Sequence, residues 1–230
     1  MAKHPKSTAD QHAVPMVLQG ADCTSLYFAL EELQSRMSNS RPDELELNYT
    51  KTMMGFLLLH QKPRHIAMIG LGGGSLAKFC YRYLPDTNIT VVEINPHVID
   101  LRQRFQIPDD GERFTVIQGD GAEFLSQADS EFDVIMVDGF DHQGQPPQLC
   151  SLRFYQDCYK ALSQPGIMVA NLHETNPLYE SFIGRIDLTF EGNFGEIVGN
   201  LEGNIIVFAG KDIAIDPYKL RCRQEVTRNV

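Results

Sequence analysis

Short apolar runs alternate with amphipathic stretches through most of the chain, and this order predicts buried strands separated by helices. The predicted strands cover residues 66–69, 89–94, 114–118, 132–137 and 167–171. The predicted helices between them cover residues 76–83, 97–105, 121–128 and 152–162. Because a helical crossover joins each strand to the next, the pattern predicts an α/β fold with a doubly wound, mostly parallel sheet.

The first 47 residues do not follow this alternation. Residues 1–12 are polar and lack periodicity, which is typical of a disordered tail. Residues 13–47 hold short strand-like segments at 25–28 and 33–37, followed by a turn-rich run from Ser38 to Asp43. We therefore expect a small N-terminal β appendage ahead of the main domain.

Residues 48–230 are predicted to form that main domain. It is expected to begin with a helix at 49–60, which ends because Lys62-Pro63 interrupts the apolar periodicity. Near its end, the segments 195–198 and 204–209 flank Glu202-Gly203 and predict an antiparallel hairpin at the sheet edge.

Composition narrows the class of protein. The chain has 230 residues, 43% hydrophobic and 22% charged, which suits one sizeable core. No apolar run approaches the roughly 20 residues that span a bilayer, so we expect no membrane span. The formal net charge of −10 argues against nucleic acid as a partner, because phosphate binding depends on Lys and Arg. The histidines share no ligand spacing, so no metal is expected.

The cysteines indicate the compartment. Their number, five, is odd, they form no CxxC pair, and no hydrophobic signal segment precedes them. The pattern predicts reduced thiols in the cytoplasm, each acting as a small buried apolar residue.

Residues at the carboxyl ends of parallel strands are the ones that meet ligands in such a sheet. The first predicted strand ends in a glycine loop that contains Gly70, Gly72, Gly73 and Gly74. Glycines there permit a tight turn and let a ligand lie against the backbone at a helix N-terminus. A tight strand-to-helix turn without a ligand explains the same spacing.

The next two strand ends carry single carboxylates. Glu93 lies 23 positions after Gly70, a spacing that suits a carboxylate accepting hydrogen bonds from ribose hydroxyls, in a nicotinamide dinucleotide or in another nucleoside. Asp120 ends the third strand, where it can accept a hydrogen bond from an adenine amino group. It can equally serve as the N-cap of the following helix.

The fourth strand ends with Asp138 and Asp141 on a turn. Two carboxylates at a ligand-facing turn can hold a cation, or orient an amine and take its proton as it becomes a nucleophile. Ordinary turn formation by Asp and Gly is the alternative.

Four motifs occur in the order Ile69-Gly-Leu-Gly-Gly-Gly-Ser75, Val92-Glu-Ile-Asn-Pro96, Gly119-Asp-Gly-Ala122 and Val137-Asp-Gly-Phe-Asp141. In this set the chain resembles the spermidine synthase, or polyamine aminopropyltransferase, family, and in particular its short, divergent bacterial members. The resemblance implies a core like that of S-adenosylmethionine-dependent methyltransferases over residues 48–230, an N-terminal β unit and a homodimer. It also implies transfer of an aminopropyl group from decarboxylated S-adenosylmethionine to a polyamine or other amine, with release of methylthioadenosine.

The same resemblance assigns roles to residues. It implies that Asp138 orients and deprotonates the attacking amine, that Asp141 helps to bind the cation, and that Tyr49 binds the amine substrate together with them. The residues it assigns to the nucleoside co-substrate are Gly70, Gly72, Gly73, Gly74, Glu93, Ile94, Asp120, Gly121, Ala122 and Asp138.

The chain departs from the family pattern on the amine side. Gly73 stands where the family's glycine loop carries an aspartate, and Tyr49-Thr50-Lys51 replaces Tyr-His/Gln-Glu. The usual Asp-Pro is Asp141-His142. Two alternatives therefore stay open, namely a methyltransferase that uses intact S-adenosylmethionine and a nucleoside-binding protein without turnover.

Overall fold

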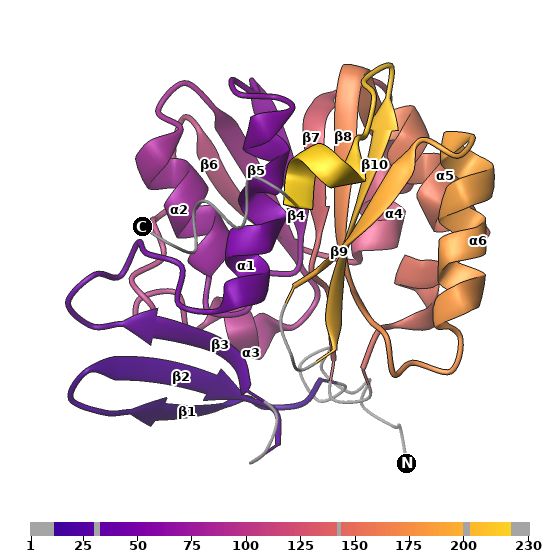
Figure 1. Cartoon of the computed structure of the whole chain (residues 1–230). Helices are drawn as coiled ribbons and strands as arrows, with labels where there is room; N and C mark the ends of the chain where they lie inside the picture. The colour runs from indigo at the N-terminus through magenta and orange to yellow at the C-terminus, as the bar shows by residue number, and fades with distance from the viewer. Residues whose placement is uncertain (1–11, 30–32, 142–143, 200–202, 222–230) are drawn as a thin grey trace, which may run out of the picture.

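The computed structural model describes residues 12–29, 33–141, 144–199 and 203–221, and its elements form a small N-terminal sheet and a large central sheet with helices on both faces (Figure 1). The predicted tail at residues 1–12 lies outside this description except for His12. Among the described residues, no helix is long and apolar enough to cross a membrane.

The central sheet has seven strands in the order β6-β5-β4-β7-β8-β10-β9. Their bounds are β4 His65–Ile69, β5 Asn88–Glu93, β6 Phe114–Gln118, β7 Phe132–Val137, β8 Leu162–His173, β9 Phe194–Val198 and β10 Asn204–Lys211. Strands β4 to β8 pair in parallel, whereas β10 pairs antiparallel with both β8 and β9. The predicted doubly wound sheet with an antiparallel C-terminal hairpin is confirmed.

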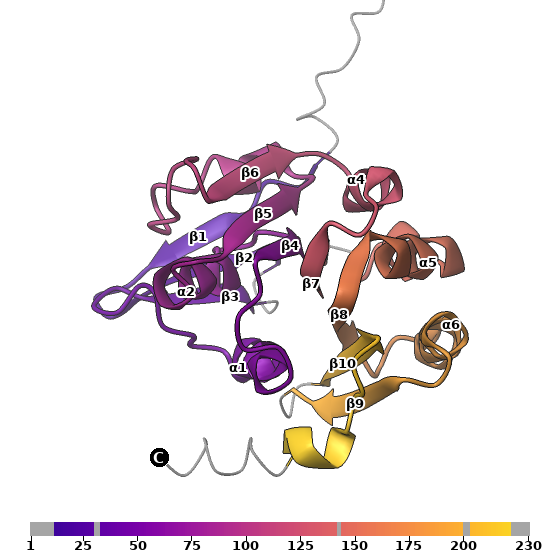
Figure 2. The same cartoon turned by 90° about the horizontal axis from the view of Figure 1, so that it is seen from above.

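Helices cover both faces of this sheet, as the view from above shows (Figure 2). The helical elements are α1 Asn48–Met53, η2 Met54–Leu58, α2 Ser75–Tyr83, α3 Pro96–Ile99, α4 Gly121–Gln127, η3 Pro147–Cys150, α5 Leu152–Ala161 and α6 Tyr179–Phe190. Side chains of β4 alternate between the two cores. Ile66 and Met68 pack in the cluster with α1, α2 and α3, whereas Ala67 and Ile69 pack with α4, α5 and α6. This period of two explains why four consecutive residues of β4, from Ile66 to Ile69, are apolar.

The N-terminal sheet consists of β1 Met16–Gln19, β2 Cys23–Tyr27 and β3 Leu33–Ser38, all antiparallel. The sequence pattern predicted β2 and β3 and missed β1. Leu26 and Met37 are buried in the same core cluster as α1 and α2. The appendage therefore packs directly against one face of the main domain.

Three boundaries differ from the sequence predictions. The helix predicted at 97–105 is limited to the four residues of α3, and the chain then runs through turns to Gln106, whose φ is +54°. The helix predicted at 49–60 is divided into α1 and the 3-10 helix η2. Strand β8 begins five residues early, at Leu162, because it continues through Pro165 and Gly166, two residues that normally argue against a strand.

Helix α6 was not predicted. Its apolar positions Phe182, Ile186 and Phe190 recur every four residues and are buried against the core, so the periodic signal was present. The four described cysteines are free thiols. Cys80, Cys150 and Cys158 are buried, whereas Cys23 is half-buried. Cys222 lies outside the described residues.

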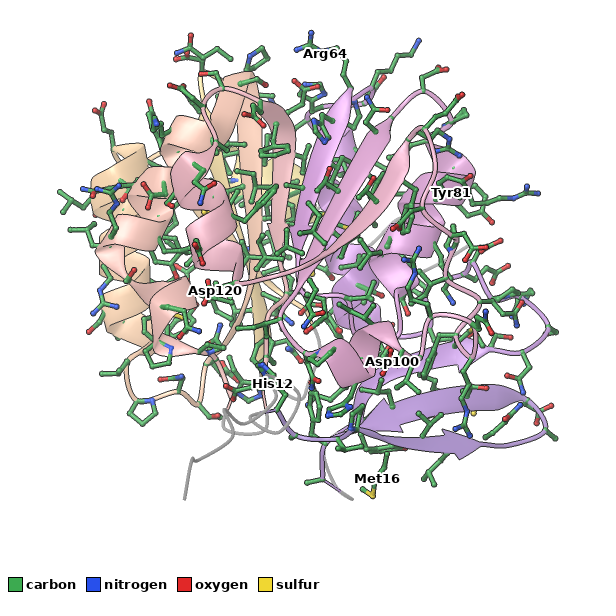
Figure 3. All side chains as sticks on the ribbon, turned by 180° about the vertical axis from the view of Figure 1, so that it is seen from behind. His12, Met16, Arg64, Tyr81, Asp100 and Asp120 are labelled. Atoms are coloured by element: carbon green, nitrogen blue, oxygen red, sulfur yellow. The ribbon has the colours of Figure 1, made fainter. Side chains whose placement is uncertain are left out.

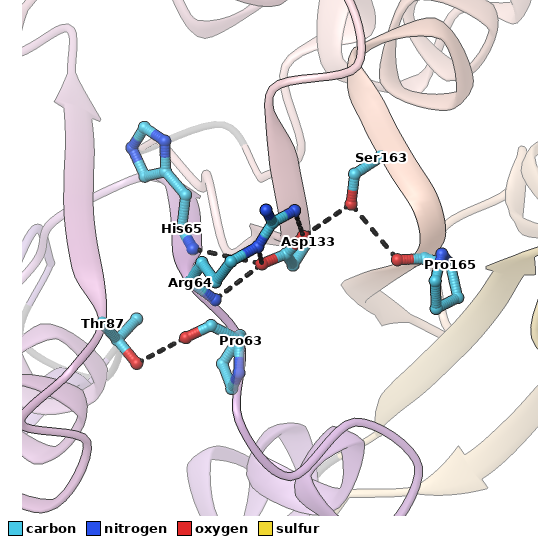
Figure 4. Close-up of polar contacts among 7 residues, drawn as sticks. All are labelled: Pro63, Arg64, His65, Thr87, Asp133, Ser163 and Pro165. Carbon is cyan, nitrogen blue, oxygen red and sulfur yellow. Dashed lines mark hydrogen bonds and ion pairs between the residues drawn. The ribbon is translucent and has the colours of Figure 1, made fainter.

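A buried carboxylate ties the amino ends of three strands together (Figure 4). Asp133 of β7 accepts hydrogen bonds from the Arg64 backbone nitrogen at 2.6 Å and from the Ser163 hydroxyl at 2.7 Å. The Arg64 guanidinium adds an ion pair at 3.2 Å. Burial would raise the pKa of Asp133, but the bonds from Ser163 and Arg64 outweigh it and hold this pKa below 3.8. The charged form therefore stabilises the end of the sheet away from the carboxyl ends.

Replacing Asp133 by Asn should lower the free energy of unfolding by about 1–3 kcal/mol at pH 7, since an amide nitrogen cannot accept these bonds. Urea titrations would measure this, with Asp129→Asn as the exposed control, expected to change stability by less than about 0.5 kcal/mol. Because the pKa of Asp133 is lowered by folding, its contribution is complete above pH 3.8 and is lost as the pH falls through the folded-state pKa. An undiminished difference at pH 2 would contradict this account.

Candidate active site

A cleft of about 1330 Å³ lies at the carboxyl ends of the parallel strands. The strand order reverses between β4 and β7, so the cleft occupies the switch point where ligands bind in sheets of this type. In Figure 3, Asp120 and His12, which line the cleft, lie well away from Arg64 at the other end of the strands. Residues of the N-terminal sheet, including Leu26 and Ser35, also line it.

The loop after β4 requires glycine at several positions. Gly70, Gly72 and Gly74 have φ of +99°, +51° and +69°, conformations that other residues rarely adopt. A Cβ on Gly70 would also lie 2.3 Å from the backbone oxygen of Asp138. Gly70 and Gly72 line the cleft. The ends of β4 and β7 can therefore approach each other only because position 70 lacks a side chain.

Gly73 has a different environment. A Cβ there would lie 2.5 Å from the Ser35 hydroxyl oxygen and 2.9 Å from the Phe105 ring. The Ser35 side chain is 3.4 Å from the Ser75 hydroxyl, and both serines line the cleft. The N-terminal sheet thus occupies the space in which a side chain at position 73 would lie. Within the loop, Gly73 faces Ser35 and Phe105 and Gly74 faces Ile107, and neither glycine lines the cleft. Their assignment to the nucleoside therefore stays a prediction.

Glu93 fixes the glycine loop from the end of β5. Its two carboxylate oxygens accept hydrogen bonds from the backbone nitrogens of Leu71 at 2.9 Å and Asn95 at 2.8 Å. Burial raises the pKa of Glu93, and these backbone hydrogen bonds oppose the rise. The backbone nitrogens of Gly72 and Ile94 contribute to the same effect, and Glu93 lines the cleft, so the carboxylate that holds the loop also faces the cleft. Ile94 beside it is 42% exposed and offers apolar surface in the cleft.

Asp120 is the N-cap of α4. Its Oδ1 atom accepts hydrogen bonds from the backbone nitrogens of Ala122 at 2.7 Å and Glu123 at 3.2 Å. Both bonds use one oxygen, and Asp120 still lines the cleft, so capping leaves Oδ2 to a ligand. Gly121 packs against Ile69, where a Cβ would lie 2.3 Å from a methyl carbon. Ala122 contributes its backbone to the cap.

Asp138 follows β7 and is held at both carboxylate oxygens. The Tyr49 hydroxyl donates to Oδ2 at 3.2 Å, and the Asn171 amide donates to Oδ1 at 2.8 Å. Burial raises the pKa of Asp138, while the bonds from Asn171 and Tyr49 oppose the rise. Burial and the nearby Asp138 charge raise the pKa of Tyr49, which keeps the phenol a donor. The result is an oriented carboxylate in the lining of the cleft.

Asp141 lies in the turn that follows. Its backbone exchanges two hydrogen bonds with Gly144, at 2.9 and 3.1 Å, and the residue lines the cleft. His142 is outside the described residues. Lys51, which replaces an acid in the family pattern, is exposed and is not among the described residues that line the cleft. Thr50 is buried and lines the cleft instead.

Charge in the cleft is strongly one-sided. Among the described residues that line it, five carry carboxylates and none is Lys or Arg; the carboxylates are Glu46, Glu93, Asp120, Asp138 and Asp141. Such a cleft attracts cations and disfavours anions.

Residues that the strand-end rule did not select complete the site. Asn171, near the end of β8, and Asn204 of β10 both line the cleft. Gln145 donates from its amide to the Asn171 backbone oxygen at 3.0 Å and so ties the turn after Asp141 to β8. Applying the same rule to the fifth strand would have found Asn171. Nothing in the sequence places Asn204 beside it.

The fold, with its cleft at the switch point of a seven-stranded sheet, belongs to the methyltransferase-like α/β class. The model of the spermine/spermidine synthase domain matches residues 46–196. A polyamine aminopropyltransferase of Neisseria meningitidis serogroup A is 39% identical over 96% of this chain and 88% of that protein. The chain therefore belongs to the spermine/spermidine synthase family and is a transferase.

Solved structures agree with this class at the level of the fold. A probable spermidine synthase from Corynebacterium glutamicum aligns with a TM-score of 0.74 and 20% identity, over 85% of this chain and 76% of that one. Human methyltransferase-like protein 13, solved in complex with SAH, aligns with a TM-score of 0.67 and 24% identity, over 79% of this chain and 91% of that one. The expected methyltransferase-like fold is confirmed.

Restoring the family's aspartate should be unfavourable here. Gly73→Asp would force a carboxylate into the space held by Ser35 and Phe105, so we expect a loss of about 1–3 kcal/mol of stability and weaker binding of methylthioadenosine. Thermal unfolding and calorimetry would measure both. Gly111→Asp is the matched control, because a Cβ at Gly111 meets nothing within 4 Å. A stable Gly73→Asp variant that binds the decarboxylated co-substrate more tightly would contradict this interpretation.

Proposed function

We propose that the chain transfers an aminopropyl group from decarboxylated S-adenosylmethionine to a small amine and releases methylthioadenosine. The observation that carries the proposal is the Asp138 carboxylate, held by Tyr49 and Asn171 in a cleft whose described lining has carboxylates and no Lys or Arg. Both reactants are cationic, one as a sulfonium and one as an ammonium, so they suit this charge.

The nucleoside is proposed to lie across the ends of β4, β5 and β6. Glu93 would accept hydrogen bonds from the ribose hydroxyls, and Asp120 with the Gly121 backbone would meet the adenine. Ile94 would supply an apolar contact for the base. The geometry that supports this placement is the row of cleft-lining residues Gly70, Gly72, Glu93, Asp120 and Gly121 along consecutive strand ends.

Asp138 is proposed as the base and Asp141 as a second contact for the amine. An amine with a pKa near 10 must lose a proton before it attacks, and a carboxylate within hydrogen-bond distance can accept that proton. The nitrogen then forms a bond to the aminopropyl carbon as the carbon–sulfur bond breaks, and the electron pair leaves with the neutral thioether. Because the leaving group is uncharged, alignment and exclusion of water are the main requirements.

This chemistry itself requires no metal ion. Homodimer formation and a cytoplasmic location also remain predictions from the sequence and from the family resemblance. The amine acceptor is proposed only by class, as a small diamine or polyamine.

The direct test supplies decarboxylated S-adenosylmethionine with 1,3-diaminopropane, putrescine, cadaverine or spermidine, and measures methylthioadenosine by chromatography. We expect product with at least one amine. Parallel reactions with intact S-adenosylmethionine should yield no S-adenosylhomocysteine. Turnover only with the intact compound would establish the methyltransferase alternative, and binding without any turnover would establish the non-catalytic one.

Asp138→Asn should lower kcat by about 100- to 10,000-fold, because an amide cannot accept the amine proton. The affinity for methylthioadenosine should stay within about threefold of wild type. Asp86→Asn, an exposed change of the same kind, should leave kcat unchanged. A fully active Asp138→Asn variant would remove Asp138 from the chemistry.

Glu93→Ala should weaken methylthioadenosine binding by about 1–3 kcal/mol, because both the ribose contacts and the hydrogen bonds that hold the glycine loop are lost. Titration calorimetry would measure the change, with the exposed Glu112→Ala as control. Unchanged affinity would assign Glu93 to a purely structural role.

A further inference from the structure

The proposed mechanism requires Asp138 to stay ionised and to keep one orientation, and two asparagines outside the sequence motifs bear on both requirements. Asn171 is 3% exposed and its amide nitrogen lies 2.8 Å from Asp138 Oδ1. Asn204 donates from its own amide nitrogen to Asn171 Oδ1 at 3.0 Å. The three side chains form one directed chain of hydrogen bonds from β10 through β8 to the loop after β7.

An asparagine side chain can present either its oxygen or its NH2 group to a neighbour. With its oxygen toward Asp138, Asn171 would repel the carboxylate; with its NH2 group there, it stabilises the charge. The bond from Asn204 decides between them, since it occupies the Asn171 oxygen. Antiparallel pairing places the two residues on the same face of the sheet, because Asn204 is opposite His173 and Asn171 is opposite Ile206.

We propose that Asn171 and Asn204 act as a pair of positioning residues for the transfer reaction, in which Asn204 fixes the Asn171 amide and Asn171 fixes the Asp138 carboxylate. This inference rests on the proposed function, in which Asp138 is the base. It gives the antiparallel strand β10 a part in the chemistry, although β10 carries none of the sequence motifs. Neither asparagine is assigned a proton-transfer step.

The pair predicts a specific order of effects. Asn171→Leu removes the donor, so the protonated form of Asp138 gains stability and the acid limb of kcat/KM against pH should rise by about one pH unit. Asn204→Asp places an acceptor beside the Asn171 oxygen, which favours rotation of the amide and turns its oxygen toward Asp138. Asn204→Asp should therefore also shift the acid limb of kcat/KM to higher pH. The shift should exceed that of Asn204→Ala, which only removes the hydrogen bond to the Asn171 amide.

Other titratable groups share the cleft, so the carboxyl group of Asp138 must be observed directly. They are Tyr49 of α1, Glu46 ahead of it, Glu93 at the end of β5, Asp120 after β6, Asp141 in the loop of Asp138, and His12 and His173. In protein labelled with ¹³C-aspartate, the Asp138 signal is the one that disappears in Asp138→Asn. Its titration by NMR does not depend on turnover.

The experiment combines pH–rate profiles and this titration for wild type, Asn171→Leu, Asn204→Asp, Asn204→Ala and the exposed control Asn88→Asp. The inference is supported if the titration midpoint of Asp138 rises in Asn171→Leu and Asn204→Asp, rises by a smaller amount in Asn204→Ala, and does not change in Asn88→Asp. An unmoved Asp138 titration in both Asn171→Leu and Asn204→Asp overturns it, even if the rate falls.

Two further outcomes separate this inference from the proposed function. If Asn171→Leu does not fold, as thermal unfolding would show, Asn204→Asp and Asn204→Ala alone decide, because Asn204 is only partly buried. If wild type transfers no aminopropyl group although the Asp138 titration shifts as expected, the proposed function fails while the hydrogen-bond chain stands. The pair then positions Asp138 for a different reaction.

Discussion

The backbone contact between the ends of β4 and β7 is the constraint on which the site depends. Asp138 donates from its backbone nitrogen to the Ile69 oxygen at 2.9 Å, and the missing Cβ of Gly70 leaves room for the Asp138 carbonyl. The glycine loop and the acidic loop therefore meet at the switch point of the sheet. In the proposed function, a nucleoside held by the first loop would lie beside a carboxylate carried by the second.

Each of the three carboxylates around this contact, Glu93, Asp120 and Asp138, accepts hydrogen bonds from defined donors. The Glu93 and Asp120 carboxylates each accept hydrogen bonds from backbone donors at a loop or helix start, and both residues line the cleft. Asp138 is held by side chains instead, one from α1 and one from β8. These side-chain partners link the orientation of Asp138 to distant elements, including β10, because Asn204 of β10 donates a hydrogen bond to Asn171.

Much of this architecture follows from local sequence. The apolar runs predict β4 to β8, and the rule that ligands meet strand ends selects Gly70, Glu93, Asp120 and Asp138 without any structure. The capping role of Asp120, left open by the sequence, is settled by its two bonds to the helix start. The short α3 and the early start of β8 were missed because tertiary packing overrides local propensity there.

The contacts that could not be predicted from the sequence join residues far apart in the chain. Ser35 is separated by 40 residues from Ser75 and Asn204 by 33 from Asn171, and neither contact leaves a periodic trace in the chain. The most direct test of the central claim is a crystal structure with methylthioadenosine and a diamine. We expect the ribose hydroxyls on Glu93 and an amine nitrogen about 2.6–3.2 Å from Asp138. A nucleoside bound away from Glu93, or an amine outside hydrogen-bond reach of Asp138, would contradict the account.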